Sequence, residues 1–161
     1  SIPMGVVTLS ENYGSSQMSV EMYRRMVEDV SAPMADFAAR NGIGARVAAE
    51  AVQMLGTSGT VTTLAGIHLG LARYDRSVVD GTYLDFDTIR SISRGLAEMT
   101  YEERCRYSCV GTDRADLVVA GCAILEAICD LWPVGRLRVA DRGVREGILD
   151  GLLNSANRRR A

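Results

Sequence analysis

The chain has 161 residues, of which 47% are hydrophobic and 24% are charged, and its formal net charge is -2. This length and apolar content suit one domain with its own core and are too small for two. The near-neutral charge lacks the basic footprint of a nucleic-acid binder, so we expect no nucleic-acid partner. All 18 basic residues are arginine, which excludes chemistry that needs a Schiff-base lysine or the lysine of a P-loop.

The cysteines and the single histidine do not form a metal-binding pattern. No C-x-x-C pair occurs, and His68 is the only histidine, so the spacing predicts no zinc-type site. Cys122 and Cys129 lie seven residues apart in an apolar segment, which is typical of buried free thiols in a reducing cytoplasm. We therefore expect a cytoplasmic protein that binds no metal through its cysteines.

No segment is expected to enter a membrane. Residues 1–20 lack the basic start and the uninterrupted apolar run of a signal peptide. The longest apolar stretch, 115–132, contains three acidic residues, Asp116, Glu126 and Asp130. Acids at this density argue against a bilayer-spanning helix.

In chain order, the first elements are a short strand and an amphipathic helix. Residues 2–9 are rich in β-branched side chains and predict a lone strand, followed by turn residues at 12–16. From Ser19 onward, apolar residues recur every four positions, which predicts an amphipathic helix through Val30. Pro33 predicts a kink or a second helix that ends before Asn41.

The middle of the chain predicts a strand and two helices. Residues 46–55 end in the sequence Gly-Thr-Ser-Gly, so their second half is expected to be a strand that feeds a turn. Residues 61–69 place apolar side chains on one face of a helix, with Gly70 as its stop. After an irregular stretch at 71–86, Asp87 is expected to cap a helix that extends to Met99.

The last third predicts a buried helix, a strand and a final helix. Residues 115–132 are apolar on nearly all sides and predict a central helix. Residues 137–140 then predict a strand, 141–143 a turn, 144–153 a helix and 154–161 a frayed tail. This order of strands and helices is typical of an α/β domain whose small sheet is covered by helices.

Three ordered motifs resemble one known family. They are Gly-Thr-Ser-Gly-Thr-Val-Thr-Thr-Leu-Ala at 56–65, Arg-Ala-Asp at 114–116 opening an apolar helix through Glu126, and Val-Ala-Asp-Arg-Gly-Val-Arg-Glu-Gly at 139–147. Together with the opening Ser-Ile-Pro-Met-Gly, they resemble the exopolyphosphatase and guanosine pentaphosphate phosphohydrolase family over nearly the whole chain.

The resemblance implies a ribonuclease-H-like domain of the actin-like ATPase superfamily. In that family, two such domains face each other across a cleft that holds phosphates. Residues 1–153 resemble the second domain alone. The first phosphate loop, the catalytic glutamate and the second phosphate loop of the family all lie before the point that matches Ser1.

The activity that the resemblance implies is hydrolysis of a phosphoanhydride. The family releases the terminal phosphate of polyphosphate or the 5′-γ-phosphate of guanosine pentaphosphate, with magnesium or another divalent cation. The resemblance implies no catalytic residue and no metal ligand in this chain, which alone is expected to be inactive. Its expected partners are the missing N-terminal domain, polyphosphate or guanosine penta- or tetraphosphate, and a second copy in a homodimer. A different class also stays open, a non-catalytic nucleotide-sensing or dimerisation module.

The resemblance and the local pattern together suggest where phosphate binds. Gly56, Thr57, Ser58, Gly59 and Thr60 form a corner before a helix, where free N–H groups favour an anion. The same residues also suit a simple helix cap and a tight turn. Arg142 follows a strand end and is a second phosphate-facing candidate, with a surface ion pair to Glu146 as the alternative.

Other polar residues favour structural roles. Arg114 and Asp116 read as a helix-capping pair, and Glu126 as a satisfied buried acid. His68 lies on an apolar face and is expected in the core or at an interface. Residues 158–160 are three arginines and read as a solvated tail.

Overall fold

A three-stranded mixed sheet forms the centre of the fold. The computed structural model describes residues 2–14 and 18–158, with side chains through Leu153. The strands β1 (Met54–Gly56), β2 (Tyr83–Asp85) and β3 (Arg136–Val139) lie in the order β1-β3-β2. Strand β1 is parallel to β3, and β2 is antiparallel to it. The parallel pair joins segments far apart in the sequence.

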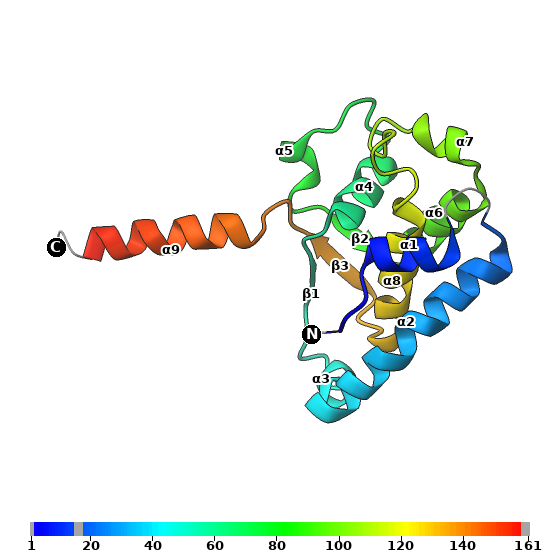
Figure 1. The fold of residues 1–161 in the computed structure, drawn as a ribbon. Coiled ribbons are helices and arrows are strands. Elements are labelled where there is room, and N and C mark those ends of the chain that lie inside the picture. Colours follow the sequence, from blue (N-terminus) through cyan, green and yellow to red (C-terminus); the bar gives the residue numbers. More distant parts are fainter. Residues whose placement is uncertain (1, 15–17, 159–161) are drawn as a thin grey trace.

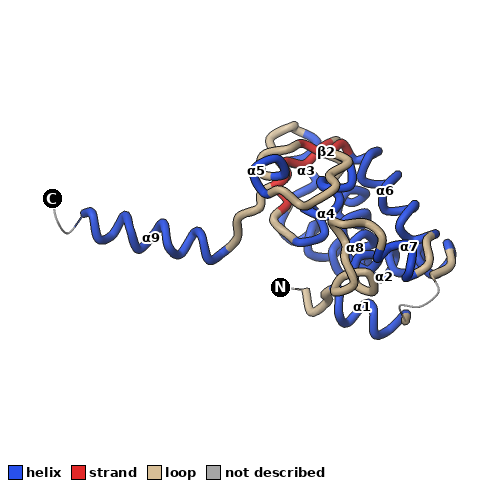
Figure 2. Tube along the Cα trace, turned by 90° about the horizontal axis from the view of Figure 1, so that it is seen from above, coloured by secondary structure: helices blue, strands red, loops and turns tan. Residues whose placement is uncertain are grey.

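The helices gather around the sheet except for the last one, which projects from the body (Figures 1 and 2). Their bounds are α1 Val6–Tyr13, α2 Val20–Asn41, α3 Ile43–Ala48, α4 Gly59–His68, α5 Arg76–Val79, α6 Phe86–Glu98, α7 Tyr101–Cys105, α8 Val118–Leu131 and α9 Val144–Arg158.

Helix α8 is the centre of the hydrophobic core. Its Cys122, Ala123 and Ala127 are fully buried, in one cluster with Met26 of α2 and Ile89 of α6. This burial on nearly all sides is what an apolar composition without polar faces predicts. The expected central helix is confirmed, although it begins at Val118 and residues 112–117 form turns before it.

The predicted strand at 2–9 is wrong, because these residues enter helix α1. Gly5 is extended and forms the N-cap, and Leu9 is 1% exposed within the core cluster. The Ser10 hydroxyl donates to the carbonyl oxygen of Asp116 at 3.2 Å and ties α1 to the segment before α8. Packing of Leu9 into the core outweighs the β propensity of Val6 and Val7 in this segment.

Helix α2 is one continuous helix, and Pro33 lies in its interior. The apolar stripe continues past the proline through Met34 and Ala38 into the core, and Gly42 ends the helix in a left-handed conformation with φ 61°. Packing of this stripe compensates for the hydrogen bond that proline removes. The alternative of a second helix beginning at Pro33 is therefore wrong, while the end near Asn41 is confirmed.

The sheet and several helix ends also differ from expectation. The stretch 71–86, expected to be irregular, contains α5 and strand β2, whose Leu84 is buried opposite Leu137. The N-cap of α6 is Asp85 rather than Asp87, and it makes no side-chain capping bond. Helix α9 continues to Arg158 instead of ending at 153, and residues 159–161 lie outside the described residues. Three-residue strands are too short for a periodic pattern to reveal.

The expected strand in the second half of 46–55 and the helix after it are both confirmed, as β1 and α4. Within the part of the chain that the structure describes, no helix has both the length and the apolar composition needed to span a membrane.

Helices α4 and α8 touch at a glycine. A Cβ built on Gly121 would lie 2.1 Å from Oγ1 of Thr60, a distance that no real side chain tolerates. Glycine at this position therefore allows the first turn of α4 to lie directly against the first turn of α8. The contact brings the segments that precede the two helices side by side.

Replacing Gly121 by alanine is expected to destabilise the fold by about 1–3 kcal/mol, the usual cost of overpacking, despite the better helix propensity of alanine. Urea unfolding measures the loss. Gly95 of α6 has no atom within 4 Å of an added Cβ, so Gly95→Ala is the matched control and should be neutral or stabilising. In a Thr60→Ala background, Gly121→Ala should cost much less; an undiminished cost would contradict the contact.

Candidate functional site

A polar pocket of about 510 Å³ opens at the corner where β1 leads into α4. Two chain segments form its walls, residues 57–59 with Thr62 at the start of α4 and residues 109–114 before α8. Tyr74 and Asp141 complete the lining from the loop before α5 and the end of β3. The pocket thus collects residues from four separate parts of the sequence at the carboxyl end of the parallel strand pair.

The floor of the pocket is the N-terminus of α4. Ser58 is the N-cap, and its hydroxyl accepts a hydrogen bond from the N–H of Val61 at 3.3 Å. The first N–H groups of a helix have no acceptor inside the helix, and the helix dipole makes this end partially positive. The capping role and the anion-favouring role that the sequence suggested for this corner are therefore compatible in one geometry.

The guanidinium of Arg114 lies over this helix start. A Cβ built on Gly59 would be 3.0 Å from Nη1 of Arg114, so the absence of a side chain at Gly59 leaves room for the arginine. Among the described residues, no carboxylate forms an ion pair with Arg114. The pocket therefore holds an exposed cation whose charge no neighbouring acid neutralises.

The loop that carries Arg114 is held from below by a buried arginine. Arg104 is 2% exposed, and its Nε donates to the carbonyl oxygen of Ala115 at 2.7 Å, while Nη1 donates to that of Met99 at 2.6 Å. Burial lowers the pKa of the Arg104 guanidinium. Gly111, at φ 67°, provides the left-handed turn that points the loop toward the pocket.

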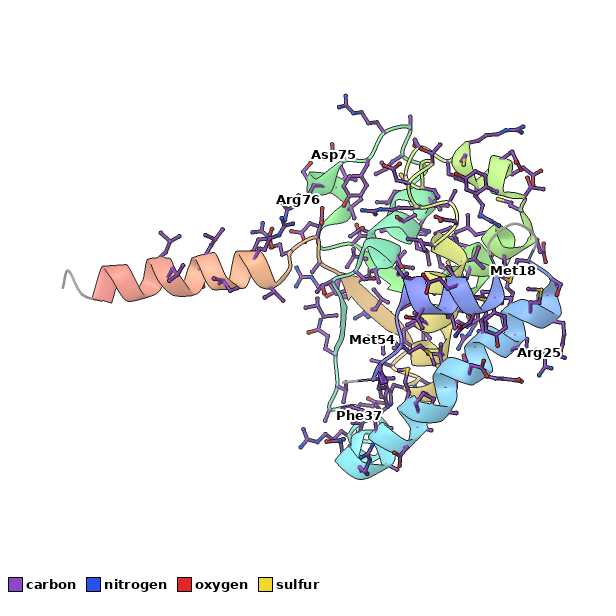
Figure 3. All side chains as sticks on the ribbon, viewed as in Figure 1. Met18, Arg25, Phe37, Met54, Asp75 and Arg76 are labelled. Carbon is purple, nitrogen blue, oxygen red and sulfur yellow. The ribbon has the colours of Figure 1, made fainter. Side chains whose placement is uncertain are left out.

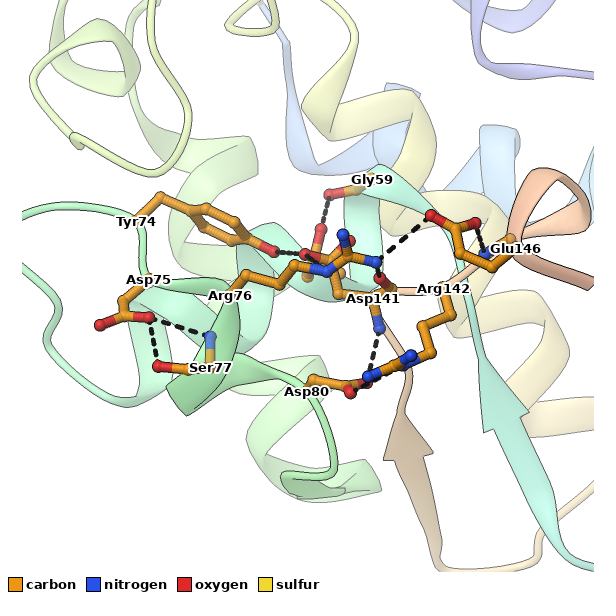
Figure 4. Close-up of polar contacts among 11 residues, drawn as sticks. Gly59, Tyr74, Asp75, Arg76, Ser77, Asp80, Asp141, Arg142 and Glu146 are labelled. Atoms are coloured by element: carbon orange, nitrogen blue, oxygen red, sulfur yellow. Dashed lines mark hydrogen bonds and ion pairs between the residues drawn. The ribbon is translucent and has the colours of Figure 1, made fainter. Parts of the chain in front are cut away.

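Asp141 forms the opposite wall and is fixed by two partners (Figure 4). The Tyr74 hydroxyl donates to its Oδ2 at 2.7 Å, and Nε of Arg76 lies 3.5 Å from the same oxygen. Burial, together with this hydrogen bond, raises the pKa of Tyr74 to about 12. Tyr74 is therefore a neutral hydrogen-bond donor at physiological pH and not a base.

The six residues predicted to face phosphate do not all reach the pocket. Thr57, Ser58 and Gly59 line it. Gly56 instead permits close packing, since an added Cβ would lie 2.8 Å from the Val61 side chain, and Thr60 points at Gly121. The missing side chain at Gly56 and the Thr60 side chain thus both serve the packing of the fold.

Arg142, the sixth residue, turns away to an ion pair with Asp80. Its Nε lies 3.3 Å from Oδ2 of Asp80, and the alternative pairing with Glu146 is wrong. Glu146 instead accepts the Gly143 N–H at 2.8 Å and lies 3.4 Å from Nη2 of Arg76. The turn at 141–143 is therefore a cluster of charges, in which each acid already has a partner.

The sequence reading missed the pocket residues Arg114 and Tyr74. Arg114 and Asp116 do not cap α8, whose N-cap is Leu117 and makes no side-chain bond. A signal was present, since a Gly-Thr pair precedes each apolar helix, with Ser58 between the pair and α4 and residues 113–117 between the pair and α8. His68 is exposed at the last position of α4, so a place in the core is wrong, and a place at an interface stays a prediction.

Glu126 and the cysteines have the structural roles that were expected. Glu126 is 7% exposed, accepts from the Tyr23 hydroxyl at 2.8 Å and lies 3.7 Å from Arg94. Cys122 and Cys129 are buried free thiols, and burial raises the pKa of each to about 12. Over the described residues, no three His, Cys, Asp or Glu side chains gather closely enough to hold a metal ion.

The model of the Ppx/GppA phosphatase family matches residues 1–156. The chain belongs to this family. Among curated proteins, no sequence matches it.

Solved structures of the Ppx/GppA family share the fold. The Aquifex aeolicus family member is 25% identical with a TM-score of 0.82, and the similarity covers 97% of this chain and 48% of that one. The type II variant of the Aquifex aeolicus Ppx/GppA phosphatase is 26% identical with a TM-score of 0.78, covering 92% and 47%. An exopolyphosphatase from Cytophaga hutchinsonii, 21% identical with a TM-score of 0.74, covers 96% and 49% and supports the fold alone.

These similarities confirm the predicted α/β, ribonuclease-H-like fold of the actin-like ATPase superfamily. The chain spans about half the length of the Ppx/GppA structures that it matches.

The charge cluster makes one pH-dependent prediction. The Gly143 N–H and the Arg76 guanidinium hold the pKa of Glu146 below its ordinary range. The stabilisation that Glu146 provides is thus fully present above about pH 4.3, the ordinary glutamate value, and is lost as the pH falls through the lowered folded value. The protection factor of the Gly147 amide, whose N–H donates to the carbonyl oxygen of Gly143 at 3.3 Å, should fall over that acidic range relative to the intrinsic exchange rate at each pH. Glu146→Gln should remove this pH dependence, and a variant that keeps it would assign the effect to another acid.

Proposed function

We propose that this chain is one half of a phosphoanhydride hydrolase that releases the terminal phosphate of polyphosphate or the 5′-γ-phosphate of guanosine pentaphosphate. Membership of the Ppx/GppA phosphatase family supports hydrolysis of a phosphate ester or anhydride. The pocket between α4 and the Arg114 loop is the proposed place where this chain contacts the phosphates. Four free cysteines support a location in the reducing cytoplasm.

One observation carries this proposal, namely the Arg114 guanidinium above the N-terminus of α4, which forms no ion pair with a carboxylate of the described residues. A guanidinium binds phosphate oxygens with two parallel hydrogen bonds, and the N–H groups at a helix start bind further oxygens of the same group. Thr57 and Ser58 add hydroxyls at the rim. A chain of phosphates carries several negative charges, so it is the ligand class that gains most from this arrangement.

The chain's own contribution is to bind and orient, not to attack. Phosphoryl transfer depends on positioning and on neutralising charge at the transferred group. The two carboxylates at the pocket do not suit a water-activating role, because Asp141 is occupied by Tyr74 and Arg76, and Asp113 is exposed on a loop. We therefore propose that the base lies in the complementary half, the part of the polypeptide outside this chain.

Magnesium or another divalent cation is the proposed cofactor of the complete enzyme. The residues of this chain do not fit such an ion alone, since the described residues contain no group of three ligating side chains. Asp141 faces an arginine that would repel a cation. The complementary half is thus proposed to supply the metal ligands.

Removing the Arg114 guanidinium tests the pocket. Arg114→Gln should weaken binding of inorganic tripolyphosphate by about tenfold to a hundredfold, since a hydrogen bond to a charged group is worth about 1.5–3 kcal/mol. Gly59→Val should act similarly, because its side chain would displace Arg114, and the fold should persist in both variants. Calorimetry gives the affinity and circular dichroism the fold.

Two further arginines give variants of equal charge change, one as a control and one as a test of the second candidate. Arg46 lies on α3, outside the pocket, so Arg46→Gln should leave the affinity unchanged. Arg142→Gln tests the second sequence-based candidate. Normal tripolyphosphate binding by Arg114→Gln, or an equal loss with Arg46→Gln, would refute the pocket as a specific site.

The division of labour between the halves gives a further prediction. The purified 161-residue chain should release no phosphate from tripolyphosphate or guanosine pentaphosphate, and addition of the complementary half should restore turnover. A colorimetric phosphate assay measures both. Release by the chain alone that is abolished by Asp141→Asn would place the base in this half. Ligand binding without turnover in the complete protein would favour the alternative of a non-catalytic nucleotide-sensing module.

A further inference from the structure

A second pocket, of about 850 Å³, lies among helices α2, α6 and α8. Its lining shares no residue with the pocket at the start of α4. Most of the lining is apolar, with Val27 from α2, Ala97 from α6 and Leu131 from α8. Met18, which lies just before α2, adds a further apolar side chain (Figure 3). A mostly apolar hollow of this size is typical of sites for small organic ligands.

Small residues on one side of α2 leave space for the hollow. Val27, Ser31 and Ala35 follow one another at intervals of four, so they lie on the same side of the helix, and all three line the pocket. The Ser31 hydroxyl donates to the carbonyl oxygen of Val27 at 2.7 Å. This part of the wall is therefore shallow, and its polar group is already satisfied within α2.

A buried carboxylate faces the pocket from α8. Glu126 is 7% exposed, and its Oε2 accepts a hydrogen bond from the Tyr23 hydroxyl at 2.8 Å. Burial raises the pKa of Tyr23, so the hydroxyl keeps its proton and remains the donor. This bond ties α2 to α8 and needs only one of the two carboxylate oxygens.

The other oxygen of Glu126 has no hydrogen bond from the residues that the structure describes. Nη2 of Arg94 is 3.7 Å from Oε1, which is beyond hydrogen-bond distance, and the Arg94 side chain is 66% exposed. A buried acceptor without a donor is costly, and most such atoms in folded proteins have a partner. Oε1 is therefore suited to a donor that enters from the pocket.

Acids outnumber bases around the pocket. The charged residues of its lining are Glu28, Glu98, Glu126 and Asp130 against Arg24 and Arg94. Arg24 is engaged by Glu21 at 2.8 Å and by Glu28, both on its own helix. This excess of negative charge repels an anionic ligand and attracts a cation.

We propose that this pocket binds a small organic ammonium, whose apolar body lies among α2, α6 and α8 and whose N–H donates to Oε1 of Glu126. The position of Arg94 shows that a cationic donor can approach this oxygen. A metal ion would leave the apolar walls unused, and the described residues contain no group of three ligating side chains. The ligand class follows from the combination of apolar walls with one buried anionic acceptor.

Calorimetry of the 161-residue chain with benzylammonium tests the proposal, with benzyl alcohol and benzoate as ligands of similar shape. The ammonium should bind about tenfold or more tightly than the alcohol, because a hydrogen bond between charged groups is stronger than one to a neutral group. Benzoate should not bind. Glu126→Gln keeps an acceptor for Tyr23 but removes the charge, so it should lower the ammonium affinity to that of the alcohol and leave the alcohol affinity unchanged.

Three variants complete the test. Glu102→Gln is the matched control, because Glu102 is exposed on α7 outside the pocket, and it should have no effect. Arg94→Gln should strengthen ammonium binding by about twofold to fivefold, the worth of the exposed ion pair that competes with the ligand. Ala35→Phe should fill the pocket and abolish binding of both ligands, with circular dichroism to verify the fold.

Equal affinity of the chain for benzylammonium and benzyl alcohol would overturn the proposal. So would an equal loss in Glu126→Gln and Glu102→Gln, or weaker ammonium binding by Arg94→Gln, which also decides the matter if Glu126→Gln does not fold. Self-association of the chain that benzylammonium reverses would assign the pocket to a second copy instead. Tripolyphosphate binding should be unchanged by Ala35→Phe, so the two pockets are tested separately.

Discussion

The contact between α4 and α8 at Gly121 is the constraint on which the site depends. Because no side chain intervenes, the first turns of the two helices meet, and Thr60 packs directly on the glycine. The segments that lead into these helices are then forced together. One brings the N-terminus of α4 and the other brings Arg114, so a packing requirement inside the core creates a polar pocket at the surface.

Arg104 holds the segment that carries Arg114 in place from inside the domain. It is among the largest fully buried side chains, and its guanidinium is bound to backbone carbonyls of the segments around it. Burying a cation is unfavourable, and burial accordingly lowers the pKa of the Arg104 guanidinium. The cation is tolerated because backbone carbonyls accept its hydrogen bonds. The loop at 111–114 contains few apolar residues that could hold it on the core. The hydrogen bonds of Arg104 therefore fix its position, and with it the position of the exposed Arg114.

Periodic segments were predictable from the sequence, and short or cooperative features were not. The stripes that form α2, α4 and α8 and the strand β1 before the Gly-Thr-Ser-Gly corner could all be recognised. Helix α1 was mistaken for a strand because Leu9 alone decides its packing, and β2 has too few residues to show a period. For the site, Ser58 and Gly59 were found from local turn chemistry. Arg114 and Tyr74 were missed, because their positions depend on contacts between residues distant in the chain.

The outward direction of α9 also has a mechanical consequence. A helix of 15 residues is about 22 Å long at 1.5 Å per residue, and it leaves the body through the four-residue turn at 140–143. A rotation of about 15° at this connection would therefore displace the far end of the helix by roughly 6 Å. Asp141 belongs both to this connection and to the pocket wall. The contacts of a single carboxylate are thus shared between the pocket and the base of the projecting helix.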